Sequence, residues 1–182
     1  MAAEPPASWS RAQRRLHWGI AALVFTAVPV AVVMVALPFT RLLLKFVLYQ
    51  AHKTVGLTVL LLASAQLALH WRRGRPPPDP ALPRWQRRAS AATHLALFAL
   101  LLAVPLLGYL SAAAAPIRIP TLFLGVVPVP HVIGPDAALF AVLRRAHLAL
   151  ALLLVVLALG HAAMALHHHR RGRAVLARML RG

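Results

Sequence analysis

Four long apolar stretches constrain the fold of this chain more than any other feature of its sequence. They cover about residues 16–37, 50–70, 91–115 and 143–168. A helix needs about 20 apolar residues to cross the hydrocarbon core of a bilayer, and each stretch is that long. The first stretch also exceeds the usual apolar core of a secretory signal, about 7–15 residues, so we expect a retained helix. The sequence predicts an all-α membrane protein, a four-helix transmembrane bundle forming one domain over residues 1–182.

The basic residues predict how this bundle is oriented. The chain has 20 Lys and Arg, three acids and a net charge of +17, which for a soluble domain would suggest nucleic acid as a partner. Here the bases lie between the apolar stretches, so we exclude nucleic acid and expect the lipid bilayer as the partner. Fourteen of the 20 bases lie before the first stretch, between the second and third, or after the fourth. The positive-inside rule then places both termini in the cytoplasm, with the protein in a bacterial inner membrane.

The basic C-terminal tail, residues 170–182, mixes arginines with apolar residues. This composition suits a short helix lying on an anionic leaflet, and equally a frayed basic end.

The histidines carry the candidate chemistry. The chain has no cysteine, so disulfides, iron–sulfur clusters and thiol chemistry are excluded, and redox work would need a cofactor held by other ligands. His17 opens the first stretch on the cytoplasmic side, while His52 and His147 open the second and fourth on the periplasmic side. His161 follows His147 by 14 residues, about 21 Å deeper and within about 40° of the same helix face. The four histidines therefore fall into an outer layer and an inner layer of two each.

Two facing imidazoles can fill both axial positions of a haem iron, and bundle interiors are where such cofactors lie. We therefore predict two bis-histidine haems, with His52 and His147 as the outer metal ligands and His17 and His161 as the inner ones. Two alternatives remain open. The histidines could form hydrogen bonds between helices. They could also bind zinc or copper, which is weaker because neither layer offers a carboxylate or thiolate.

Further residues are assigned to the surroundings of the two layers. His94 opens the third stretch at the inner layer, where it could bind a haem propionate or a quinone, or make a structural contact. Lys53, Arg144 and Arg145 flank the outer histidines as cationic partners for propionates, unless they serve only as topology signals. For His70, at the inner end of the second stretch, the simplest account is a side chain that reaches out to the membrane interface.

Several short motifs together resemble one known family, the bacterial cytochromes b561, which has relatives among the cytochrome b subunits of hydrogenases. The motifs are LHW at 16–18, HKTVGL at 52–57, HLAL at 94–97, VPLLG at 104–108, AH at 146–147 and GHAAMALHH at 160–168. No single motif is specific, but their order and spacing are, and the resemblance covers nearly the whole chain.

The resemblance implies a di-haem b-type bundle, often a homodimer, that passes electrons between a periplasmic donor or acceptor and the membrane quinone pool, with ubiquinone as a substrate. It carries the ligand roles over to His17, His52, His147 and His161. Some members resemble quinone oxidoreductases, including ones linked to superoxide oxidation, so whether this chain is an enzyme stays open. Family members often have Arg where this chain has Gln66, which puts the corresponding inner-site chemistry in question.

Two other functions stay open on the sequence alone. The chain could be the haem-bearing membrane anchor of a larger oxidoreductase, or a histidine-rich metal transporter.

Overall fold

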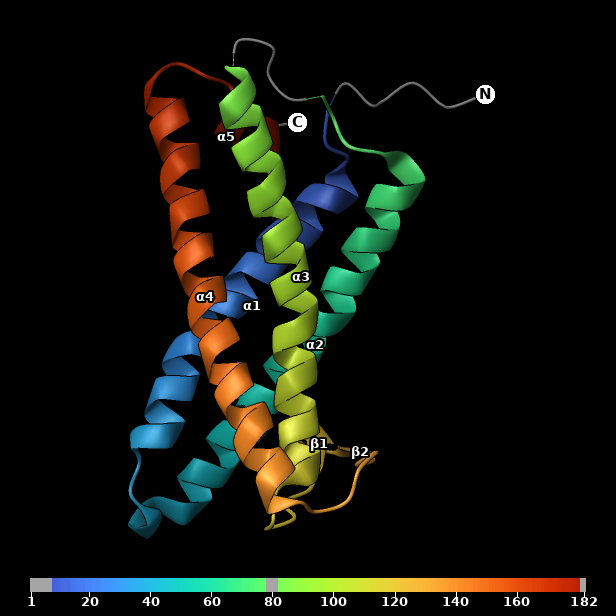
Figure 1. Ribbon diagram of the computed structural model, residues 1–182, viewed down its shortest axis with the longest axis vertical. Coiled ribbons are helices and arrows are strands. Elements are labelled where there is room, and N and C mark those ends of the chain that lie inside the picture. Colours follow the sequence, from blue (N-terminus) through green and yellow to red (C-terminus); the bar gives the residue numbers. More distant parts are fainter. Residues whose placement is uncertain (1–7, 78–81, 181–182) are drawn as a thin grey trace.

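The computed structural model describes residues 8–77 and 82–180, and these residues form a helical bundle (Figure 1). Its four long helices are α1 (Arg11–Ala36), α2 (Leu42–Arg73), α3 (Arg84–Ala114) and α4 (Ala137–Arg170). The smaller elements are the 3-10 turn η1 (Phe39–Arg41), the strands β1 (Thr121–Phe123) and β2 (Val127–Val129), and the short helix α5 (Val175–Leu180). All four long helices are long and apolar enough to cross a membrane. The prediction of an all-α, four-helix membrane bundle is confirmed. The predicted tail falls partly on α5, and residues 181–182 lie outside the described residues.

The helices alternate in direction. The start of α1 and the short α5 lie at one end of the bundle, and the two strands lie at the other (Figure 1). Helix α1 packs against α2, α2 against α3 and α3 against α4, whereas the described residues of α4 do not approach the backbones of α1 and α2 as closely. Side chains rather than close backbone packing therefore join α4 to the first two helices.

All four long helices begin before the apolar stretches that predict them, and side-chain caps mark the starts of two of them, α1 and α4. At the start of α1, Ser10 and Gln13 form a reciprocal capping box: the Gln13 amide donates to Ser10 Oγ, and the Ser10 amide donates to Gln13 Oε1. At the start of α4, Leu139 N donates to Asp136 Oδ1. Three histidines that stand at the start of apolar stretches consequently lie ten residues inside their helices, about 15 Å from the first turn; they are His52, His94 and His147.

The antiparallel hairpin between α3 and α4 was not predicted from the sequence. Thr121 pairs with Val129 and Phe123 with Val127, and the turn has positive φ at Leu124 (54°) and Gly125 (78°). Side chains of α2 hold the hairpin in place. Gln50 Nε2 donates to Pro120 O at 2.8 Å and Leu122 N donates to Gln50 Oε1 at 2.9 Å, while Leu124 N donates to Thr54 Oγ1 at 3.1 Å. The hairpin therefore covers the end of the bundle at which His52 lies.

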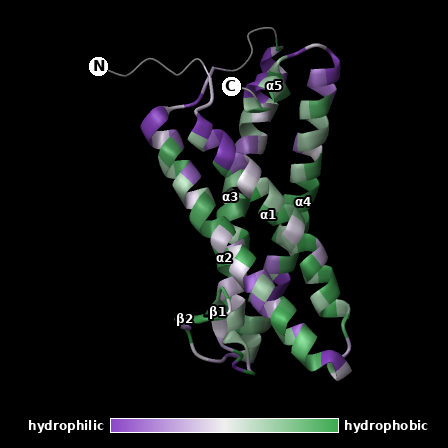
Figure 2. Ribbon diagram, turned by 180° about the vertical axis from the view of Figure 1, so that it is seen from behind, coloured by the Kyte–Doolittle hydropathy of each residue, from purple (hydrophilic) through white to green (hydrophobic). Residues whose placement is uncertain are grey.

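Apolar residues at mid-height form the core. One cluster consists of Ile20, Val59 and Ala63, and a second of Leu100, Val104 and Leu154. Val24 and Leu101 pack against both clusters, which joins them into one apolar layer. Large apolar side chains are exposed on all four long helices. Most of the helical ribbon is hydrophobic, and hydrophilic residues gather toward the ends (Figure 2). This distribution is that of a protein whose solvent is the bilayer.

Candidate functional site

The outer pair of histidines spans the bundle from α2 to α4. The ring centroids of His52 and His147 are 6.2 Å apart, and the two ring planes are at 89°. His147 Nδ1 donates to the backbone carbonyl of Val104 in α3 at 2.9 Å. A neutral histidine that donates through Nδ1 has its free electron pair on Nε2. This bond therefore fixes both the orientation and the tautomer of His147.

Helix α3 comes close enough to make this bond because residue 108 is glycine. A Cβ at Gly108 would lie 2.9 Å from His147 Cε1 and 3.1 Å from His147 Nδ1, closer than side chains pack. Gly108 thus provides the space that the imidazole of His147 occupies. The VPLLG motif at 104–108 therefore supplies both the acceptor for His147 and the space for its ring.

The inner pair repeats this spacing from α1 to α4. The ring centroids of His17 and His161 are also 6.2 Å apart, with the planes at 69°. His94 of α3 lies next to them, with its ring centroid 5.1 Å from that of His161, and its Nδ1 donates to Ser90 O at 2.7 Å. The structure thus brings together both of the pairs expected from the sequence, and it places His94 beside the inner pair, at the layer expected for it.

Helix α4 fixes the separation of the two pairs. His147 and His161 lie 14 residues apart on it, about 21 Å along the axis. Leu154 lies halfway between them and belongs to the apolar layer of the core, at 6% exposure. An apolar layer therefore separates the two histidine pairs.

The distances within each pair fit a haem held by two histidines. With metal–nitrogen bonds of about 2 Å, two imidazoles that bind one metal ion from opposite sides have ring centroids roughly 6 Å apart. Both observed separations are 6.2 Å. In addition, His52 Nδ1 is buried and has no hydrogen-bond partner among the described residues. This nitrogen of the outer pair is therefore available to a bound group. A zinc site usually draws three or four ligands from the protein. Among residues 8–77 and 82–180, no group of three or more His, Cys, Asp or Glu is placed to hold a metal ion.

The cationic residues assigned to the outer layer lie near it without contacting the pair. Lys53 Nζ donates to the carbonyls of Ile119 and Pro120, at 3.3 Å each, and so ties α2 to the loop before β1. The side chains of Arg144 and Arg145 are exposed on α4, one turn before His147.

His70 was missed as an interior residue, and the account of a side chain at the interface is wrong for it. It is 7% exposed, and its ring packs between Trp9 (5.4 Å) and Phe98 (5.2 Å). Both of its ring nitrogens are buried without a hydrogen-bond partner among the described residues. Such groups are costly, by about 1–3 kcal/mol, and normally have a partner. One sequence signal could have located it. Gln66, one turn earlier on the same face of α2, is another polar residue within the apolar stretch, and it is buried too.

His131 lies in the loop that follows the hairpin, outside the membrane-spanning helices. Its Nε2 is 3.3 Å from Thr121 Oγ1. Burial, together with the positive charges of Lys53 and Arg118, lowers the pKa of His131 below its usual value.

The fold and the two pairs fit one class of protein, the membrane-embedded helical bundles that can hold a redox cofactor between their helices. A model of the prokaryotic cytochrome b561 family matches residues 8–182. Cytochrome b561 homolog 2 of Escherichia coli K12 is 36% identical over 125 residues, which make up 66% of this chain and 63% of that protein. Cytochrome b561 homolog 1 of the same organism is 30% identical over 162 residues, 88% of this chain and 89% of that protein.

The chain belongs to the prokaryotic cytochrome b561 family. It is a membrane haem protein of that family, and membership implies a b-type haem and electron transfer.

Proposed function

We propose that this chain holds two b-type haems, one between His52 and His147 and one between His17 and His161, and that it carries electrons across the inner membrane. The proposed partners are a periplasmic donor or acceptor on the outer side and a quinone of the membrane on the inner side. The equal separation of the two pairs, 6.2 Å, is the observation that carries the proposal. The positive-inside rule supports cytoplasmic termini. A single domain, a quinone partner and a homodimer are further parts of the proposal, and they rest on the family resemblance.

A b-type haem held by two histidines would supply reversible one-electron chemistry and would not bind oxygen. The residues of the chain determine where this chemistry takes place. The bond from His147 Nδ1 to Val104 O holds the ligand ring in place, and such partners also raise the basicity of a ligand. Val24, Leu101 and Leu154 keep water out of the region between the pairs.

Near the inner pair lies His70, a buried residue whose ring makes no hydrogen bond to the described residues. His70 offers two buried ring nitrogens that lack partners among the described residues, and it is near enough to His17 and His94 to interact with them electrostatically. A carboxylate of the inner haem would accept a hydrogen bond from the ring nitrogen of His70 that carries the proton. We include in the proposal that His70 is a partner of that haem, at the layer where relatives often carry Arg and this chain carries Gln66.

The pairing is tested by single replacements and haem counting. His52→Ala and His147→Ala should each remove the same haem, and His17→Ala and His161→Ala the other, so that each variant keeps one haem per chain. The measurement is the α band of the reduced, purified protein during a redox titration, together with haem content. His131→Ala, in the outer loop, is the control and should keep both haems. Loss of the same haem from His52→Ala and His17→Ala would show that the pairing is wrong.

A role as the anchor of a larger oxidoreductase is a second candidate, favoured by the outer end of the chain. Large apolar side chains on and beside the hairpin are exposed there: Leu124 (66%), Val126 (76%), Val127 (51%) and Val132 (66%). Exposed apolar groups that gather in one place are typical of protein interaction sites. Co-purification of a periplasmic subunit, lost in a Val126→Ser/Val132→Ser variant, would support this function over that of an independent carrier.

A further inference from the structure

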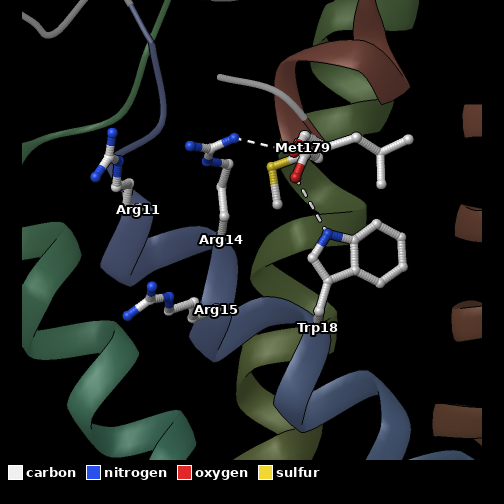
Figure 3. A pocket seen from close by; sticks show the side chains of 6 residues that line it. Arg11, Arg14, Arg15, Trp18 and Met179 are labelled. Carbon is white, nitrogen blue, oxygen red and sulfur yellow. Dashed lines mark hydrogen bonds between the residues drawn. The ribbon is translucent and has the colours of Figure 1, made fainter.

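A pocket lined by arginines lies between the start of α1 and the short helix α5. It has a volume of about 470 Å³ and is lined by Arg11, Arg14, Arg15, Trp18, Met179 and Leu180. Figure 3 shows Arg14 and Trp18 reaching toward α5, with Arg11 and Arg15 beside them on α1. We propose that this pocket binds the phosphate headgroup of an anionic phospholipid.

Two hydrogen bonds hold the pocket together. Arg14 Nη1 donates to Leu180 O at 3.1 Å, and Trp18 Nε1 donates to Met179 O at 3.1 Å (Figure 3). Both acceptors are backbone carbonyls, so these contacts fix α5 against α1 without neutralising any charge. Arg14 Nε is buried and has no partner among the described residues. Arg11 and Arg15 are exposed beside it, so the pocket presents guanidinium donors to a ligand that accepts hydrogen bonds.

The charge of the pocket indicates which ligand would bind. Three guanidinium groups share it, and the one carboxylate side chain within residues 8–77 and 82–180 is Asp136, which caps the opposite end of α4. Like charges held close together repel one another, and an anion among them relieves that repulsion. Arginine is also well suited to phosphate, because its planar group donates two parallel hydrogen bonds.

The face of α1 that leads away from the pocket indicates a lipid rather than a free anion. Arg11, Trp18, Phe25 and Val32 are spaced by seven residues, so each lies within about 20° of the one before it. Trp18, Phe25 and Val32 are 42%, 45% and 64% exposed, and they form a continuous apolar stripe. Tryptophan also favours the level of the lipid headgroups. A headgroup in the pocket would place its acyl chains along Phe25 and Val32.

The first test measures lipid binding by the full-length holoprotein in detergent, using native mass spectrometry with phosphatidylglycerol and phosphatidylcholine of equal chain length. The wild type should retain phosphatidylglycerol in preference to phosphatidylcholine. The pocket variant Arg11→Gln/Arg14→Gln/Arg15→Gln should bind phosphatidylglycerol roughly a hundredfold more weakly, from about fivefold per arginine. The control Arg72→Gln/Arg73→Gln/Arg84→Gln loses the same charge at the same end of the bundle and should lose less than about tenfold. Equal losses in the two variants would overturn the proposal.

A second test needs no arginine variant and so does not depend on how the triple variant folds. Phosphatidylglycerol with brominated acyl chains should quench the fluorescence of Trp18 more strongly than brominated phosphatidylcholine does, and Trp18→Phe should remove the difference. Equal quenching by the two lipids would contradict the proposal. Displacement of phosphatidylglycerol by an equal concentration of inorganic phosphate would show a site for free anions and overturn the assignment to a lipid.

Discussion

At the scale of single residues, the outer pair depends on a close approach between α3 and α4. The imidazole of His147 lies against Gly108 and donates to Val104 O, so its position is set by a helix that supplies no ligand to that pair. A substitution in α3 can therefore change the outer pair without touching either histidine.

We expect Gly108→Ala to impair the outer haem selectively. The added methyl group would lie 2.9 Å from His147 Cε1, and such overpacking costs about 1–3 kcal/mol. Affinity for the outer haem should fall about tenfold or more, while the inner haem stays in place. The measurement is the α band and the haem content after titration with haem. Gly160→Ala is the matched control, because a Cβ there meets nothing within 4 Å although it neighbours His161. Equal loss in both variants would sink this account.

His70 is the second residue whose replacement should be informative. If one of its buried ring nitrogens donates to a carboxylate of the inner haem, His70→Phe should weaken retention of that haem by roughly 10- to 100-fold, from the loss of a hydrogen bond to a charged group. It should also shift the midpoint potential of the inner haem alone, and His70→Gln should restore part of both. If His70→Phe only stabilises the protein and leaves the inner haem unchanged, His70 has no role toward it.

Part of the histidine site could be predicted from the sequence. Helical periodicity and depth within an apolar stretch place His147 and His161 on one face of α4, and they match His52 and His17 to the same two layers. The role of Gly108 could not be read in this way, because it arises from how α3 packs on α4. The burial of His70 was missed because it lies near the end of an apolar stretch. At that depth a side chain can either reach the interface or turn inward. In the structure, aromatic rings of the N-terminal segment and of α3 enclose it.

At the scale of elements, the helices could be predicted from hydropathy, but the hairpin and the helix ends could not. The two strands of the hairpin are only three residues long, and the prolines at 120, 128 and 130 are not typical of strands. Their position depends on hydrogen bonds to Gln50 and Thr54, about 70 residues earlier in the chain. An element that is held by such distant side chains leaves little local signal in the sequence.

The hairpin should loosen in acid. Because the folded state lowers the pKa of His131, the unfolded or detached loop binds the proton more readily. The contribution to stability is present above the unfolded pKa of about 6.5 and is lost as the pH falls through the lowered folded value. We expect hydrogen-exchange protection of residues 121–131, corrected for intrinsic rates, to decrease below about pH 6.5. His131→Gln should abolish this dependence; a variant that keeps it would point to another group.

At the scale of the whole molecule, α4 differs from the other three long helices. It carries one histidine of each pair, whereas α1 and α2 carry one histidine of a single pair each. It is also the least enclosed, with Leu154 as its one buried side chain within the described residues. The fourth helix is therefore joined to the bundle by its packing on α3, and the proposed haems would link it to α1 and α2.

This arrangement sets the order in which the protein can mature during synthesis. The ribosome completes α1, α2 and α3 first, and at that stage each layer has only half of its pair. A chain that stops after Gly134 should therefore accumulate in the membrane, as followed by immunoblotting, yet bind neither haem, whereas one that stops after Arg170 should bind both. Haem bound by the shorter chain would contradict this order. With the proposed ligands, cofactor loading would wait for α4, and a nascent chain would not become redox-active before that helix is in the membrane.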